Sequence, residues 1–107
     1  MEKSYTYHPD LSRALPEIIE DSIISRSLFK NNRMDVTLFG FAAGQELTAH
    51  TSPHNALIEV LEGELELTLG DEKIITKAGA WVRMAPNLTH ALKANTRVVM
   101  LLTLVYS

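Results

Sequence analysis

The chain of 107 residues contains no cysteine. Disulfides, thiolate nucleophiles, iron–sulfur clusters and cysteine-ligated zinc are therefore excluded, and a reducing compartment is the simplest expectation. The longest apolar run, residues 98–105, is far shorter than the ~20 residues of a membrane-spanning helix. Residues 1–8 contain no apolar signal-peptide region. We therefore expect a cytoplasmic protein with no membrane partner.

Basic side chains are also too few for a nucleic-acid binder. Ten Lys and Arg against 13 Asp and Glu give a net charge of −3, and the two signs are interspersed along the chain. Hydrophobic residues make up 46% of the sequence, an ordinary content for a globular protein with one core. The sequence predicts a single globular domain that does not bind nucleic acid.

From residue 23 onward the chain has the pattern of an all-β protein. Residues 64–69 alternate strictly between Leu and polar residues, so one face of this segment is predicted to be buried. Similar short segments follow one another every ~8–12 residues and are separated by turn residues, which is typical of a sandwich or barrel. The predicted strands are residues 23–29, 34–41, 46–50, 57–62, 64–69, 73–77, 81–84, 90–94 and 97–105.

Residues 1–22 differ from the rest. Pro9 with Asp10, and Pro16 with Glu17, are typical of helix starts, where an acidic group lies near the positive end of the helix. We predict a short N-terminal helical or irregular segment over residues 1–22, followed by one β domain over residues 23–107.

The last predicted strand is apolar on both faces. Residues 98–105 carry apolar side chains at odd and even positions, so both faces need cover. The interior of a small barrel covers only one of them. Another sheet, residues 1–22 folding back or a second copy of the protein could cover the other face, and we expect a homodimer.

Histidine is the residue type here that is best suited to chemistry. The chain has four, His8, His50, His54 and His90, and neutral imidazole is a common ligand of transition metals. His50 ends one predicted strand and His90 begins another, so closure of a barrel can bring them together. A lone histidine in a β core is more often a hydrogen-bonded structural residue than a ligand.

Two sequence patterns surround these histidines. Five residues separate Gly44 from His50, and twelve separate His50 from Gly63; a second pattern runs from Gly79 to His90. The two patterns resemble the two motifs of small single-domain cupins. The resemblance implies a double-stranded β-helix, or jelly roll, with a site inside one mouth of the barrel. We expect a closed or nearly closed antiparallel barrel with little helix.

The resemblance places metal ligands at only some of the matching positions. His50 falls on the first ligand histidine of the motif and His90 on the last. The second histidine position holds Ser52 and the glutamate position holds Ala56, which has no donor atom. The glycine position of the second motif holds Asn87, which can still adopt the left-handed conformation that a turn needs.

His54 is the candidate replacement for the missing second histidine. A set of His50, His54 and His90 would supply three nitrogens to a divalent ion (Zn, Ni, Fe or Mn), with open positions for water or substrate. In this hypothesis Ser52 and Met84 contact a bound small-molecule ligand, Met84 as an apolar wall.

Three functions stay open at this point. The first, which is the one we predict, is a metal-dependent protein that binds or acts on a small organic molecule. The second is a metal-free binding or sensing module with a degraded metal site, which Ser52 and Ala56 favour. The third is a purely structural dimerising domain. Cupins share one fold across many reactions, so the resemblance assigns no catalytic residue and no reaction, and whether the chain is an enzyme stays undecided.

Overall fold

A computed structural model describes residues 4–106, which form nine strands and one short 3₁₀ helix. Every predicted strand is present, and each boundary lies within two residues of its prediction. Residues 1–3 of the predicted N-terminal segment and residue 107 of the predicted domain lie outside the described residues. The elements are η1 (Leu11–Arg13), β1 (Ile23–Lys30), β2 (Met34–Phe41), β3 (Glu46–His50), β4 (Asn55–Glu62), β5 (Glu64–Leu69), β6 (Glu72–Lys77), β7 (Trp81–Met84), β8 (His90–Ala94) and β9 (Val98–Val105).

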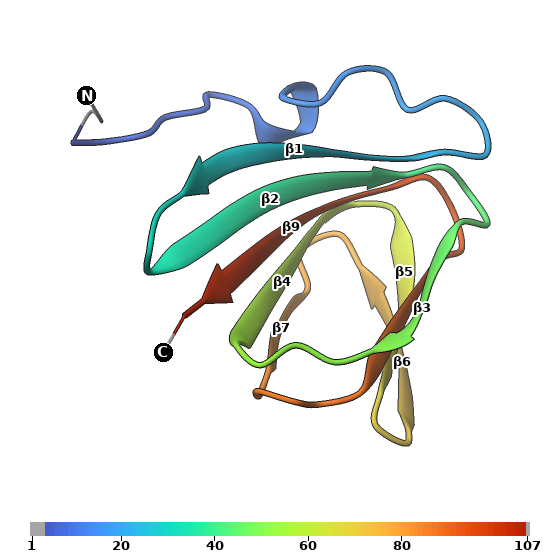
Figure 1. Ribbon diagram of the computed structural model, residues 1–107. Coiled ribbons are helices and arrows are strands. Elements are labelled where there is room, and N and C mark those ends of the chain that lie inside the picture. The colour runs from blue at the N-terminus through green and yellow to red at the C-terminus, as the bar shows by residue number, and fades with distance from the viewer. Residues whose placement is uncertain (1–3, 107) are drawn as a thin grey trace.

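The strands form two antiparallel sheets that face each other as a jelly roll (Figure 1). One sheet has the order β1-β2-β9-β4-β7 and the other the order β3-β8-β5-β6. The all-β prediction is confirmed, but the expected closed barrel is wrong. The outermost strands of each sheet pair on one side only, because the two sheets meet through side chains rather than through backbone hydrogen bonds.

The core lies between the inner faces of the two sheets. Leu65 and Leu67 of β5 are completely buried, as the alternation of residues 64–69 predicts. Ile58 and Val60 of β4 and Phe41 of β2 meet them from the other sheet. Inward-facing side chains that alternate along each strand therefore hold the sheets together by removing apolar surface from water.

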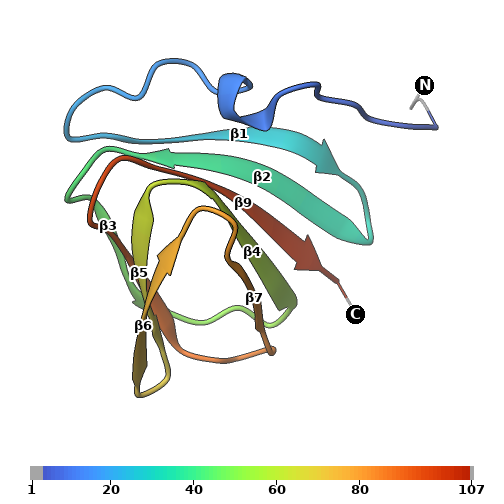
Figure 2. The same ribbon diagram turned by 180° about the vertical axis from the view of Figure 1, so that it is seen from behind.

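The outer face of the five-stranded sheet is covered in part by the N-terminal segment. Val99 of β9 is fully buried although it lies opposite Gly40 on the outer face. A Cβ atom on Gly40 would lie 2.6 Å from Ile18 Cδ1 and 3.0 Å from Leu15 Cδ1. Figure 2 shows the same segment running beside β1. The N-terminal segment therefore covers the outer face of this part of β9, as one of the alternatives given above predicts.

The predicted helix starts in the N-terminal segment are only partly correct. The first start gives η1, and the Asp10 carboxylate caps it by accepting a hydrogen bond from the Ser12 N–H at 3.1 Å. No helix follows Pro16, because Leu15 and Ile18 are used for packing on β2. Among residues 4–106, no helix is long and apolar enough to cross a lipid bilayer.

Gly63 forms the junction between β4 and β5, which lie in different sheets. Its φ of +85° is a conformation that side chains disfavour, and a Cβ atom there would collide with the Arg97 carbonyl oxygen. Gly79, between β6 and β7, has a similar φ of +97°, but a Cβ atom there would meet nothing within 4 Å. A substitution at Gly79 therefore measures backbone strain alone, whereas a substitution at Gly63 measures strain together with steric overlap.

We predict that Gly63→Ala destabilises the protein much more than Gly79→Ala. Positive φ alone should cost about 1–2 kcal/mol of unfolding free energy in Gly79→Ala. The added overlap should raise the cost in Gly63→Ala to more than about 3 kcal/mol. Urea denaturation of both variants measures the difference. Equal losses would show that the β4–β5 junction adjusts and that the close approach to Arg97 is not a constraint.

Candidate functional site

His50 and His90 lie side by side in neighbouring strands. They are directly paired between β3 and β8, and their ring centroids are 4.2 Å apart with the ring planes inclined by 58°. His90 is buried, whereas His50 is exposed. The pair therefore connects the interior between the sheets with the surface at one end of the jelly roll.

A bulge in β3 turns His50 toward the interior. Leu47 lies opposite Leu92 and His50 lies opposite His90, with a shift of register between the two pairs. The two residues of β8 are two positions apart and share the inner face, whereas those of β3 are three positions apart. Regular alternation from Leu47 would put His50 on the outer face. The extra residue therefore brings both imidazoles to one face of the sheet.

Backbone carbonyl groups determine which nitrogen of each ring carries hydrogen. The Nδ1 atom of His50 lies 2.8 Å from the Thr48 oxygen, and Nδ1 of His90 lies 2.9 Å from the Leu88 oxygen. A carbonyl oxygen only accepts, so each Nδ1 is the donor. In a neutral imidazole this leaves Nε2 with the lone pair. The site thus contains two Nε2 atoms that can accept hydrogen bonds or bind a cation.

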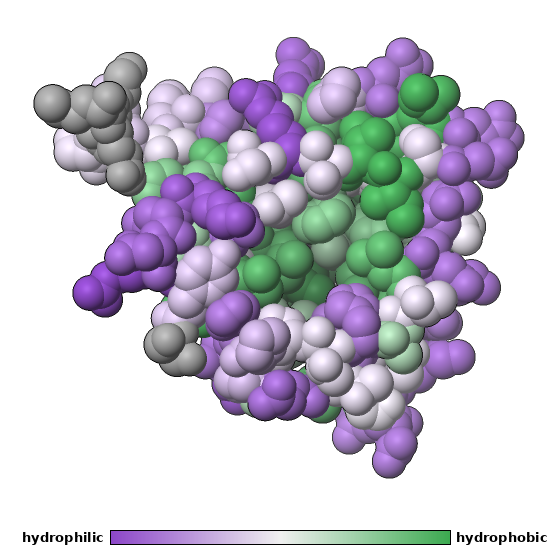
Figure 3. All heavy atoms as spheres, in the orientation of Figure 1, coloured by the Kyte–Doolittle hydropathy of each residue, from purple (hydrophilic) through white to green (hydrophobic). Residues whose placement is uncertain are grey.

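Apolar side chains are found beside His90 in its own sheet and in the core of the facing sheet. Leu69 of β5 lies opposite His90 on the same face. On the other sheet Ala56 and Met84 are paired neighbours, and both belong to the buried core. Figure 3 shows hydrophobic side chains at the centre of the face presented in Figure 1, with hydrophilic ones around them. His90 is therefore buried in a largely apolar interior, and the exposed His50 lies beside it at the edge of that interior.

Ser52 links the two loops that carry the histidines. Its carbonyl oxygen accepts a hydrogen bond from the Asn87 N–H at 2.7 Å. Asn87 has a φ of +68°, so the predicted left-handed turn before His90 is confirmed. The Ser52 hydroxyl accepts a bond from the His54 N–H at 3.3 Å. Both bonds hold the loop that follows β3.

His54 is not brought to the other two histidines. Its ring packs against Tyr106, with centroids 4.5 Å apart and planes inclined by 53°. Its Nδ1 atom is buried and has no hydrogen-bond partner. Within residues 4–106, no group of three or more His, Cys, Asp or Glu has an arrangement that could hold a metal ion. The structure therefore assembles two of the three predicted ligands in one place.

Sequence reasoning missed Tyr106. The available signal was its position two residues after Leu104, which belongs to the apolar series of the last strand. The pairing of Asn55 with Val105, which brings His54 next to Tyr106, is visible only in the folded sheet. The fourth histidine, His8, lines a separate groove of about 420 Å³ beside β1 and β2.

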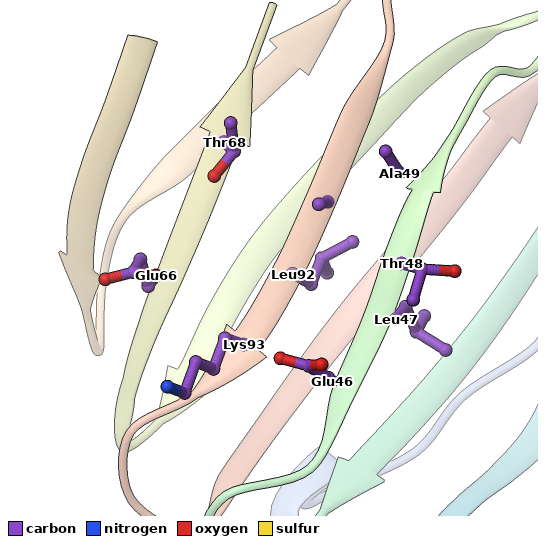
Figure 4. A pocket seen from close by; sticks show the side chains of 9 residues that line it. Glu46, Leu47, Thr48, Ala49, Glu66, Thr68, Leu92 and Lys93 are labelled. Carbon is purple, nitrogen blue, oxygen red and sulfur yellow. The ribbon is translucent and has the colours of Figure 1, made fainter. Parts of the chain in front are cut away.

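A second depression, of about 240 Å³, lies on the outer face of the four-stranded sheet (Figure 4). Glu46, Glu66 and Lys93 line it, and Lys93 lies opposite both glutamates in the strand register. Glu66 also forms an ion pair with Lys73 at 3.7 Å. The two carboxylates are matched by the two lysines, so this depression has no excess charge that would attract an ionic ligand.

Comparison with known proteins gives the family. The model of the cupin domain family matches residues 37–106. The chain belongs to the cupin family. The match includes both sequence motifs identified above, since residues 44–90 all lie inside it. No curated protein matches the chain significantly.

Solved structures are similar over most or all of the chain. A conserved protein of unknown function from Streptococcus pyogenes is 30% identical with a TM-score of 0.86, covering 100% of this chain and 91% of that one. A cupin superfamily protein from Desulfitobacterium hafniense is 26% identical with a TM-score of 0.86, covering 94% and 90%. Salicylate 1,2-dioxygenase from Pseudoaminobacter salicylatoxidans is 13% identical with a TM-score of 0.73, covering 88% and 28%, and shares the fold alone.

We predict that His54→Phe stabilises the protein. Phenylalanine keeps a ring against Tyr106 and removes the buried Nδ1 atom that has no partner. Removing such an atom should raise the free energy of unfolding by about 1 kcal/mol. Tyr106→Leu is the matched control, because it removes the ring contact and should lower the same quantity by about 1 kcal/mol. A loss of stability in His54→Phe, measured by urea denaturation, would contradict the assignment.

Proposed function

We propose that this cupin binds a small organic molecule between its two sheets and that His50 and His90 are its polar anchors. The observation that carries the proposal is the pair of imidazoles 4.2 Å apart, each with Nδ1 bound to a backbone carbonyl group. Small-molecule sites commonly combine apolar walls with a few converging polar groups. Ala56, Met84 and Leu69 would supply the walls.

The free Nε2 atoms indicate what kind of molecule fits. Neutral imidazoles with hydrogen on Nδ1 present acceptors, so the bound group must donate. Two acceptors close together match a ligand that carries two hydroxyl or amide donors on neighbouring atoms. In this proposal Ser52 and Met84 lie beside the ligand, Ser52 by holding the loop and Met84 by apolar contact.

A divalent metal ion held by the same histidines is the second candidate. The specific observation in its favour is the Nδ1 bond to a carbonyl oxygen, which also orients the rings of metal-ligating histidines. Catalytic zinc sites commonly use three protein ligands. Two nitrogens converge here, and Ala56 has no donor for a further bond, so a three-histidine centre requires His54 to leave Tyr106.

We predict that catechol binds and that 1,2-dimethoxybenzene does not. The two probes share an aromatic body, but only catechol has neighbouring hydroxyl donors for the two Nε2 atoms. Imidazole NMR signals of His50 and His90 should shift on addition of catechol. His50→Ala or His90→Ala should weaken binding about tenfold, because each removes one hydrogen bond worth about 1.4 kcal/mol. Equal binding of both probes, or no binding of either, would contradict the proposal.

Titration calorimetry with Zn²⁺, Ni²⁺ and Mn²⁺ separates the two candidates. Untagged protein purified without a nickel column is needed, since a column could load the site. A metal site of His50, His54 and His90 predicts heat in the wild type that His54→Ala removes. The metal-free site predicts no heat in the wild type and new heat in Ser52→His, which adds a third nitrogen to the loop.

The remaining expectations about the protein's surroundings stay predictions. They are a cytoplasmic location, a homodimer and the absence of a nucleic-acid partner. Neither candidate function assigns a reaction.

A further inference from the structure

A groove of about 420 Å³ lies on the outer face of the five-stranded sheet, away from the histidine pair. Leu28 and Phe29 of β1 and Val36 of β2 form its floor. Val36 has the same parity along β2 as Gly40, on which the N-terminal segment packs, so the floor belongs to the outer face. In Figures 1 and 2 the stretch before η1 runs along the end of β1. The volume falls within the range of about 300–1,000 Å³ that is typical of small-molecule sites.

A bulge in β1 brings two large apolar residues to the groove. Ser27 lies opposite Thr37, whereas the next pair is Phe29 with Val36. Leu28 is therefore an extra residue in β1. In a regular strand Leu28 and Phe29 would point to opposite faces of the sheet, yet both line the groove and both are half-buried. The bulge thus builds an apolar floor at this edge of the sheet.

The N-terminal residues that line the groove supply its polar groups. They are Thr6, Tyr7 and His8, followed by the apolar Leu11. Each of the three polar side chains can donate a hydrogen bond. Among residues 4–106 no Asp or Glu lines the groove, although acidic residues outnumber basic ones in the chain. The groove therefore combines an apolar floor with hydrogen-bond donors and contains no carboxylate.

Contacts outside the groove hold the N-terminal segment in place. The Arg26 guanidinium of β1 donates a hydrogen bond from Nη1 to the Ala14 carbonyl oxygen at 2.6 Å. Ile18 packs over Gly40 of β2. None of these four residues lines the groove. The groove is therefore formed by the fold itself, and substitutions inside it leave these contacts intact.

We propose that this groove binds a small monocarboxylic acid with an apolar body. The His8 ring donates a hydrogen bond to the carboxylate, and the body lies on Leu28, Phe29 and Val36. Hydrogen bonds to an ionised acceptor are stronger than those between neutral groups, and no acidic side chain among those lining the groove repels an anion. An amine of the same size would find no carboxylate partner there. The proposal does not rest on what binds at the histidine pair between the sheets.

Octanoate and octylamine test the proposal, because they share an apolar chain and carry opposite charges at neutral pH. Octanoate at millimolar concentration should shift the imidazole NMR signals of His8, and octylamine should not. His8→Ala should weaken octanoate binding about tenfold, because it removes a charge-assisted hydrogen bond. Val36→Thr nearly keeps the shape of the floor but adds a hydroxyl group beneath the apolar chain, so it should weaken binding about threefold. Circular dichroism checks that each variant folds.

His50→Ala separates the groove from the site between the sheets, because it removes an imidazole from the histidine pair. Octanoate binding should be unchanged in His50→Ala, and catechol binding should be unchanged in His8→Ala. Absence of octanoate binding to the wild type would overturn the proposal, as would equal binding of octanoate and octylamine. Octanoate binding that His50→Ala weakens and His8→Ala retains would also overturn it, since the acid would then lie between the sheets.

Discussion

The burial of apolar side chains between two facing sheets is the interaction on which the rest of this structure depends. No disulfide is available to a chain without cysteine, and the sheets are not joined by hydrogen bonds into a closed ring. Their relative position therefore rests on inner-face residues such as Phe41, Leu65 and Leu67, all completely buried. Since packed interiors change shape very little, this core also sets the positions of the strand ends that carry the candidate site.

The site is made from departures from regular strand geometry at those ends. One extra residue in β3 turns His50 inward, and the left-handed Asn87 shapes the turn before His90. The hydrogen bond from the Asn87 N–H to the Ser52 oxygen joins both loops. These features serve two imidazoles rather than three, because His54 is packed against Tyr106. The proposed organic donor requires only this pair of acceptors, whereas a three-histidine metal site requires His54 to leave Tyr106.

The two faces of the five-stranded sheet contact different parts of the structure. The inner face packs the core and forms one wall of the candidate site. The N-terminal segment covers part of the outer face, where it packs on Gly40. The outer face is exposed at Trp81 of β7. The apolar side chains of β9 are therefore buried by the core on the inner face and by the N-terminal segment on part of the outer face. The sequence of a strand can therefore predict burial of both faces although the chain itself covers the outer face along only part of its length.

The amino-acid sequence by itself determined the strands, the jelly-roll family and the meeting of His50 with His90. Alternation and turn residues are local properties, which is why they predict the strands. The meeting of the two histidines was predicted from the resemblance of the two motifs to those of cupins. Tertiary structure alone decided the direction of His54, the absence of a helix after Pro16 and the openness of the sheets. His54 contacts Tyr106 because β4 pairs with β9, and Ile18 packs on Gly40 because β2 leaves space there. Contacts of this kind join residues that are distant in sequence, and no local pattern encodes them.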